Sequence, residues 1–484
     1  MAFAFPDPAR GPAAAWRALP EAVVALAAAL LTLACAQWMA PGPGSAVLAV
    51  VLSLSLARSR LDRDRRGRLE AAVALPVVGL AATGVGLLLR DAPWLGAAAF
   101  TLGVSASVWL RQFGESARRA SRLIALPFVT VLTVPHLSGV HRGPLPAILV
   151  PVLVALLALA WVSALDALGR RLRLLPGILP PAPHAPAAPA RATPGQQRLS
   201  ATTRMALQMA AALACAFAVG HAGFGRHWPW VVLTAFIVHS GNRGRLEVAY
   251  KSLLRLAGAA GGTLAAAVLS LWSLPAGMHG GSSATMILLA VFLGTWLRPL
   301  NYAWWALFVT VALALLENYA GVPATAEMAL RLAAILAGAA IGVAVAWVVL
   351  PVRSTGVLRR RLADALAALG EALDPAHASR SAAPFTHALD AAKSLAPAFR
   401  AARTLGLRPA WRQPADWIDA LAACRAPAAA LIDRGATPGS VRRAVGAARQ
   451  ALREPDRLLP ALEGLRGALE AAGEPATQGV RESG

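Results

Sequence analysis

The chain has 484 residues, of which 57% are hydrophobic and only 14% are charged. Ordinary soluble domains have roughly 25% charged residues, so this composition excludes a typical soluble protein. The formal charge of +22 lies mostly in short segments between apolar runs, which is typical of membrane-protein loops and argues against nucleic-acid binding.

The apolar runs predict about twelve spanning helices in two sets of six, because the longer runs approach the roughly 20 residues that cross a bilayer. The first apolar run follows a segment without a signal-peptide pattern, so we interpret it as a retained helix. The expected helices lie at 21–40, 44–57, 70–89, 94–110, 123–135 and 145–166, and then at 203–220, 228–241, 252–274, 283–297, 302–317 and 328–350.

These runs define a first six-helix membrane repeat over 1–170 and a second over 203–352. The segment 171–202 between them is rich in Pro and Ala, which predicts an extended cytoplasmic linker. After residue 352 the charged residues become frequent, and leucines recur on one helical face at Leu358, Leu362, Leu366, Leu369 and Leu373. We therefore expect a cytoplasmic bundle of four or five helices over 353–484, ending in a disordered tail.

Short strings recur in the same order in both halves, which predicts an internal duplication. The matches are Leu33–Ala36 with Leu213–Ala216, Arg66–Glu70 with Arg243–Glu247, Trp109–Arg111 with Trp296–Arg298, and Phe128–Val131 with Phe308–Val311. The second match falls after the second helix of each half, so we expect a repeated cytoplasmic loop formed by Arg66, Arg68, Glu70, Arg243, Arg245 and Glu247. Repeats with an even number of helices share one membrane orientation.

Arginines cluster after the even-numbered helices, for example between Arg58 and Arg68 and between Arg353 and Arg361. The opposite loops carry few arginines. By the positive-inside rule, both termini should face the cytoplasm of a bacterial inner membrane.

A basic stripe enters the ninth predicted helix and is the strongest candidate site. Glu247, Lys251, Arg255, Gly258 and Gly262 follow at helical spacing, so they share one face. A cation inside a membrane normally faces a partner or a wet cavity, and glycines permit close helix contact. The stripe therefore predicts an anion site at Lys251 and Arg255; the alternative is that both side chains reach the cytoplasmic interface as anchors.

Three further residues are candidates for substrate binding. His239 and Asn242 end the eighth predicted helix, and Trp230 lies near its start. His239 could accept a coupling proton or make an interfacial hydrogen bond, and Trp230 could stack on an aromatic substrate or belong to an interfacial belt. Glu327 and Arg331 are spaced for an ion pair at the outer rim of the twelfth helix.

The second half resembles the fusaric acid resistance protein-like (FUSC) family. The similarity rests on Trp228–Phe236, followed by Lys251, Arg255, Gly258 and Gly261 at the family's spacing; Ala259 stands where the family usually has Thr. The resemblance implies a two-times-six-helix inner-membrane transporter, of the aromatic acid exporter type, with cytoplasmic helical regions.

We therefore expect a secondary transporter that exports aromatic or other small organic acids and is not an enzyme. A passive anion channel and a membrane scaffold acting through the C-terminal region are the alternatives. The expected partners are the lipid bilayer and a small organic anion, with a proton as candidate coupling ion and a second copy or an accessory envelope protein as further candidates. No cofactor, metal or nucleic acid is expected, since the cysteines and histidines lack ligand spacing and no Walker, dinucleotide or nucleophile motif occurs.

Overall fold

The computed structural model describes residues 12–59, 65–114, 117–118, 120–121, 123–124, 128, 131–132, 149–175, 199–241, 244–273, 281–319, 328–376, 380–406, 414–436 and 438–473. All regular elements in these ranges are helical. The chain forms two compact units. One, here the membrane unit, comprises 1–178, 198–242 and 251–351; the other, here the C-terminal unit, comprises 179–197, 243–250 and 352–484.

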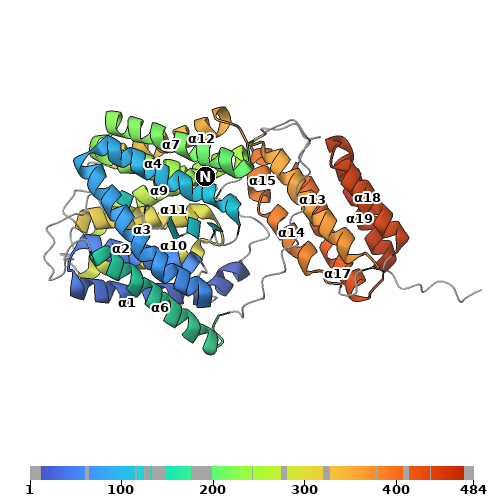
Figure 1. Ribbon diagram of the computed structural model, residues 1–484, viewed down its shortest axis with the longest axis horizontal. Coiled ribbons are helices and arrows are strands. Elements are labelled where there is room, and N and C mark those ends of the chain that lie inside the picture. Colours follow the sequence, from blue (N-terminus) through green and yellow to red (C-terminus); the bar gives the residue numbers. More distant parts are fainter. Residues whose placement is uncertain are drawn as a thin grey trace, which may run out of the picture. The chain divides into compact units, whose positions relative to one another are not determined.

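The membrane unit contains eleven apolar helices within the described residues, and they run side by side in Figure 1. They are α1 (Pro12–Met39), α2 (Pro43–Ser59), α3 (Arg65–Asp91), α4 (Pro93–Leu110), α6 (Val150–Arg171), α7 (Ala201–Gly223), α8 (Trp228–His239), α9 (Arg245–Ser273), α10 (Gly281–Leu297), α11 (Tyr302–Tyr319) and α12 (Met328–Val348). Short 3-10 turns follow α4 (η2, Arg111–Phe113) and precede α8 (η4, Gly225–His227). Most of the helix expected at 123–135 and most of the linker at 171–202 lie outside the described residues; positions 123, 124, 128, 131 and 132 are described and are helical.

Seven of these helices are long and apolar enough to cross a membrane, so the chain is a membrane protein. The seven candidate spans are Ala14–Met39, Gly67–Asp91, Pro93–Phe113, Val150–Arg171, Ala201–Gly223, Arg245–Leu269 and Met328–Val348. Many large apolar side chains on them, such as Val77, Leu102 and Leu264, are exposed at the protein surface. Such a surface is unsuited to water and is expected to contact lipid. Shorter apolar helices lie at Gly44–Ala57, Ala284–Leu297 and Tyr302–Leu315, and the total of twelve spans stays a prediction.

The positions expected to form a repeated loop are largely helical. α3 begins at Arg65, so Arg66, Arg68 and Glu70 lie in its first turns, and α9 begins at Arg245, so Arg245 and Glu247 do the same there. Arg243 lies outside the described residues. The loop prediction is wrong for these five positions because apolar runs do not reveal a polar first turn. Arg, Leu and Glu are good helix formers, so the helix extends through them.

Helix pairing follows the same pattern in both halves. α1, α2 and α6 contact one another, and so do α7, α8 and α12. In addition, α4 contacts α7, and α10 contacts α1, where the Trp296 indole donates a hydrogen bond to the Ala15 carbonyl (3.0 Å). The fourth helix of each half thus packs on the first helix of the other half.

Three glycines bring helices of the second half into backbone contact. A Cβ at Gly258 or Gly262 on α9 would lie 2.6 Å from the Ala303 carbonyl oxygen or 2.4 Å from that of Leu307, both on α11. On α12, a Cβ at Gly338 would lie 2.4 Å from the carbonyl oxygen of Val231 on α8. Only glycine fits at these three contacts, which supports the packing role expected for Gly258 and Gly262.

The C-terminal unit is built from seven helices within the described residues: α13 (Ser354–Ala372), α14 (Ala383–Lys393), α15 (Ala396–Thr404), α16 (Pro414–Ala423), α17 (Arg425–Asp433), α18 (Gly439–Ala451) and α19 (Pro455–Gly473). The leucine face predicted between Leu358 and Leu373 is fully buried in its core, beside Phe385, Ile418 and Leu465. The predicted leucine face is confirmed. The expected number of four or five helices is wrong, because the predicted runs at 384–404 and 415–434 are each divided into two helices, α14 with α15 and α16 with α17. The expected position of the unit in the cytoplasm stays a prediction.

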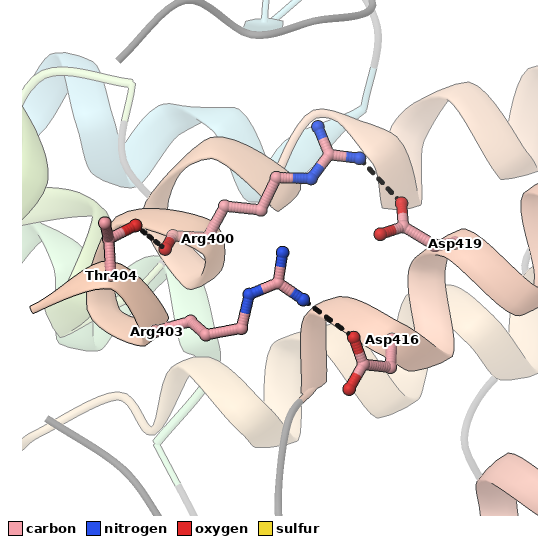
Figure 2. Close-up of polar contacts among 5 residues, drawn as sticks. All are labelled: Arg400, Arg403, Thr404, Asp416 and Asp419. Atoms are coloured by element: carbon pink, nitrogen blue, oxygen red, sulfur yellow. Dashed lines mark hydrogen bonds and ion pairs between the residues drawn. The ribbon is translucent and has the colours of Figure 1, made fainter. Parts of the chain in front are cut away.

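Ion pairs join α15 to α16 at the surface of this unit, as Figure 2 shows. Arg400 donates to Asp419 (2.6 Å) and Arg403 to Asp416 (2.8 Å). All four side chains are a quarter or more exposed, so solvent screens the attraction and each pair should contribute about 1 kcal/mol or less. The leucine core, and not these pairs, therefore determines the stability of the unit.

We predict that Gly262→Ala destabilises the protein by about 1–3 kcal/mol, because the new methyl group would overlap the backbone of α11. Gly261→Ala is the matched control, since its Cβ would meet only the Leu307 side chain, at 3.3 Å. The difference is measured by heating the detergent-purified variants and recording the midpoint temperature at which each loses its monodisperse peak. Equal midpoints for the two variants would contradict the close α9–α11 contact.

We also predict that Leu366→Ala lowers the stability of the C-terminal unit by about 2–5 kcal/mol. Removal of the Arg403–Asp416 pair in a double-mutant cycle should yield a coupling of about 1 kcal/mol or less. Unfolding of the full-length protein, followed by limited proteolysis within residues 352–473, measures both. A larger effect for the ion pair would refute the dominance of the leucine core.

Candidate functional site

The candidate site lies in the membrane unit, where α8, α9, α11 and α12 supply its residues. α8 is 12 residues long, so it extends about 18 Å and is too short for a hydrocarbon core of about 30 Å. Ten of its residues are buried, and the helix begins with Pro229 in its first turn, where a missing N–H costs little. α8 is thus a short internal helix enclosed by protein.

Arg255 lies on the buried face of α9 that the sequence predicted. Its side chain is 0% exposed, and none of its three guanidinium nitrogens has a hydrogen-bond partner among the described residues. A guanidinium keeps its charge in proteins and carries five N–H donors. A buried charge without partners is costly, so such residues usually mark a ligand or ion pathway.

Lys251 lies one turn before Arg255 and is only partly buried. Its ammonium donates a hydrogen bond of 2.7 Å to the carbonyl oxygen of Ser240, at the C-terminal end of α8. A cation there satisfies a terminal carbonyl and offsets the negative end of the helix dipole. The same ammonium lies 5.6 Å from the centroid of the Tyr302 ring. Lys251 is therefore already engaged in capping α8, whereas Arg255 is not engaged in this way.

Of the three remaining candidates for substrate binding, His239 and Trp230 are buried on α8 and Asn242 is not described. His239 is buried at the end of α8, where its Nδ1 lies 3.3 Å from the Ala235 carbonyl oxygen and its Nε2 has no hydrogen-bond partner in the described part of the chain. Trp230 is buried on α8. Asn242 lies outside the described residues.

Two residues that were not expected to line this site, Tyr302 and Arg331, belong to the same region. Tyr302, at the start of α11, and Arg331, on α12, both interact electrostatically with Arg255. Arg331 is 2% exposed, and its guanidinium carbon lies 5.5 Å from the centroid of the Trp230 ring. Arg331 is therefore enclosed by protein near the start of α12. Its expected ion pair with Glu327 at the outer rim stays a prediction, because Glu327 lies outside the described residues.

A signal for Arg331 was present in the sequence. Arg331, Ile335, Gly338 and Gly342 follow at helical spacing and are all buried on α12, as Arg255, Gly258 and Gly262 are on α9. An arginine followed on one face by two glycines thus occurs on both helices. In each case the glycines contact a neighbouring helix and keep the arginine on the buried face.

The polar groups of this region that the structure describes indicate which ligands it can bind. The three charged side chains named above, Lys251, Arg255 and Arg331, are cations, and no group of three or more His, Cys, Asp or Glu that could hold a metal ion occurs among the residues that the structure describes. Guanidinium groups bind carboxylates and phosphates through paired N–H donors. The arrangement can therefore bind an anion.

We predict that Arg255→Met raises the thermal stability of the protein in the absence of organic anions, because the substitution removes a buried charge that costs at least about 2.5 kcal/mol at the centre of a membrane helix. Arg255→Lys, which keeps the charge, should not do so. Thermal unfolding of the purified variants in anion-poor buffer measures the effect. Strong destabilisation by Arg255→Met alone would mean that the guanidinium has an essential protein partner.

Comparison with known proteins gives a family match in the second half of the chain. No curated protein and no solved structure matches the chain. The model of the fusaric acid resistance protein-like family matches residues 209–345, which include most of α7 and all of α8 to α11, together with Arg255 and Arg331. The resemblance inferred from the sequence is confirmed for residues 209–345, which match the model of the fusaric acid resistance protein-like family.

Proposed function

We propose that the protein is a secondary transporter in a bacterial inner membrane that exports aromatic or other small organic acids, and that Arg255 binds their carboxylate. The observation that carries this proposal is the fully buried Arg255 guanidinium, which has no hydrogen-bond partner among the described residues. A carboxylate that reached it would accept two parallel N–H hydrogen bonds and neutralise its charge. The family match supports membrane transport as the general function.

The duplicated helix pairing supports a central pathway. The fourth helix of each half packs on the first helix of the other half, as expected for two copies related by an axis along the membrane normal. Binding sites of duplicated transporters lie where the copies meet, beside interrupted or short helices. α8 is such a short helix, and α12, which carries Arg331, packs on it.

The neighbouring residues would then have separate roles. Lys251 holds the end of α8 in place through Ser240, so we assign it a positioning role and leave the carboxylate contact to Arg255. His239, buried beside α12, is the candidate for a coupling proton. The two tandem repeats, the cytoplasmic termini and the cytoplasmic C-terminal unit form part of the same proposal.

We predict that purified protein in liposomes moves labelled benzoate when a proton gradient is imposed, and that Arg255→Gln reduces the initial rate by about tenfold or more, the value of one lost charge-assisted hydrogen bond. Arg90→Gln, at an exposed position on α3, is the matched control and should transport normally. Absence of movement across a panel of aromatic acids would refute the substrate class. Equal rates for Arg255→Gln and wild type would refute the site.

Movement of benzoate against its own concentration gradient distinguishes a coupled transporter from a passive channel in the same liposomes. Accumulation of benzoate against its own gradient, driven by protons, supports coupled transport. Movement that only dissipates the benzoate gradient would indicate that the protein is a passive anion channel and not a transporter, with the same arginine in the pathway.

A further inference from the structure

One helix of the C-terminal unit, α18, carries an exposed face that is entirely basic. α18 packs on α13 and α19 (Figure 1). Its buried side consists of Val441, Val445, Ala448 and Ala451. The exposed side of the helix and the turn that follows it hold four arginines, here the α18 basic face: Arg442, Arg443, Arg449 and Arg453. The segment 439–453 contains no acidic residue, so the face has no negative charge of its own.

The four arginines of the α18 basic face differ from other arginines of the same unit in having no partner. Six arginines elsewhere in the unit form ion pairs, which are Arg361–Asp364, Arg400–Asp419, Arg403–Asp416, Arg425–Asp390, Arg457–Glu454 and Arg466–Glu470. No member of the α18 basic face has an ion pair or a hydrogen bond from its side chain to any of the described residues. The positive charge of the unit is therefore left uncompensated on this one helix.

The positions of these charges do not favour the helix itself. Arg442 and Arg443 lie near the start of α18 (Gly439–Ala451), where the unpaired N–H groups of a helix already carry a partial positive charge. The helix dipole favours Arg449 and Arg453 near the other end, but they are four residues apart, a spacing at which like charges repel. An anionic surface outside the unit would relieve both kinds of repulsion.

The residues between the arginines determine how such a surface can approach. Gly446, Ala447 and Gln450 are exposed on the same side of α18, and none of them is a large apolar residue. A helix that inserts into a bilayer needs bulky apolar side chains on the inserted face. The α18 basic face can therefore lie on a charged surface, along about 16 Å from Arg442 to Arg453, without entering the hydrocarbon.

The connection between α12 and α13 keeps an anionic surface of this kind within reach. α12 is a candidate membrane span that ends at Val348, and α13 begins at Ser354. The five residues between them extend at most about 20 Å. The C-terminal unit is thus tethered close to the bilayer, and a short tether gives its ligand there a high effective concentration.

We propose that the α18 basic face binds anionic phospholipid headgroups and docks the C-terminal unit on the surface of the bilayer that holds the protein. Each arginine close to an anionic bilayer strengthens binding by about fivefold, so the four arginines together make the contact selective for anionic over neutral lipid. The interaction is electrostatic and becomes weaker as salt is added. It is independent of the substrate proposed for the membrane unit.

The test supplies the anionic surface separately from the bilayer in which the protein is embedded. Full-length protein is placed in nanodiscs of neutral phosphatidylcholine. Co-sedimentation then measures its binding to added vesicles, made either of phosphatidylcholine alone or of phosphatidylcholine and phosphatidylglycerol in equal amounts. We expect the wild-type protein to bind the mixed vesicles in low salt, to release them in high salt and to ignore the neutral vesicles.

Two pairs of substitutions separate the α18 basic face from the total charge of the unit. Arg442→Gln with Arg449→Gln should weaken binding to the mixed vesicles about 25-fold, whereas Lys at both positions should retain most of it because the charges remain. Arg403→Gln with Arg425→Gln is the matched control. It removes the same charge from exposed arginines that already have acidic partners, and it should weaken binding by less than about twofold.

Equal binding of the wild-type protein to neutral and mixed vesicles would overturn the inference, and this comparison needs no variant to fold. Equal losses in the two pairs of Gln variants would overturn it as well, because total charge and not the α18 basic face would then determine binding. Tighter binding of a single-stranded oligonucleotide than of the mixed vesicles, lost in Arg442→Gln with Arg449→Gln, would assign the face to nucleic acid and overturn the lipid assignment.

Discussion

The burial of a permanent charge among apolar side chains is the constraint on which the rest of the membrane unit depends. Arg255 has no exposed surface, and its three guanidinium nitrogens have no hydrogen-bond partner among the described residues. Desolvation of such a charge costs several kcal/mol, so selection for folding alone would favour an apolar residue of similar volume. The free energy lost in folding is recovered when an anion binds, which links the instability of the empty site to its affinity for ligand.

Glycine makes this arrangement possible. Gly258 and Gly262 let α9 approach the backbone of α11, and Gly338 lets α12 approach that of α8. Two helix pairs at such short separation hold Arg255 and Arg331 on buried faces, where long side chains would otherwise reach toward the interface. The short α8 contributes Trp230 to one arginine and a C-terminal carbonyl to Lys251. Packing and binding in this unit thus depend on the same residues.

The sequence predicted the helices well where hydrophobicity alone decides them. The leucine face of α13 and the buried stripe of Arg255, Gly258 and Gly262 both follow from helical periodicity, which is a local property. Helix starts were less predictable, since α3 and α9 extend through polar residues. The spacing of Glu327 and Arg331 predicts a local ion pair, whereas the contact of Arg331 with Trp230 involves α8, about 100 residues earlier in the chain. The helical spacing of Arg331, Gly338 and Gly342 indicates a buried face, but it does not reveal which helix covers that face.

We expect the Arg255 guanidinium to face a ligand within the membrane unit, with no protein carboxylate or lipid headgroup as its partner. A cryo-electron microscopy structure of the protein in lipid nanodiscs, with and without 4-bromobenzoate, tests this claim most directly. We predict density for the anion within hydrogen-bond distance of Arg255 between α9 and its neighbouring helices. A guanidinium paired with a protein carboxylate, or directed at lipid headgroups in both structures, would contradict the account.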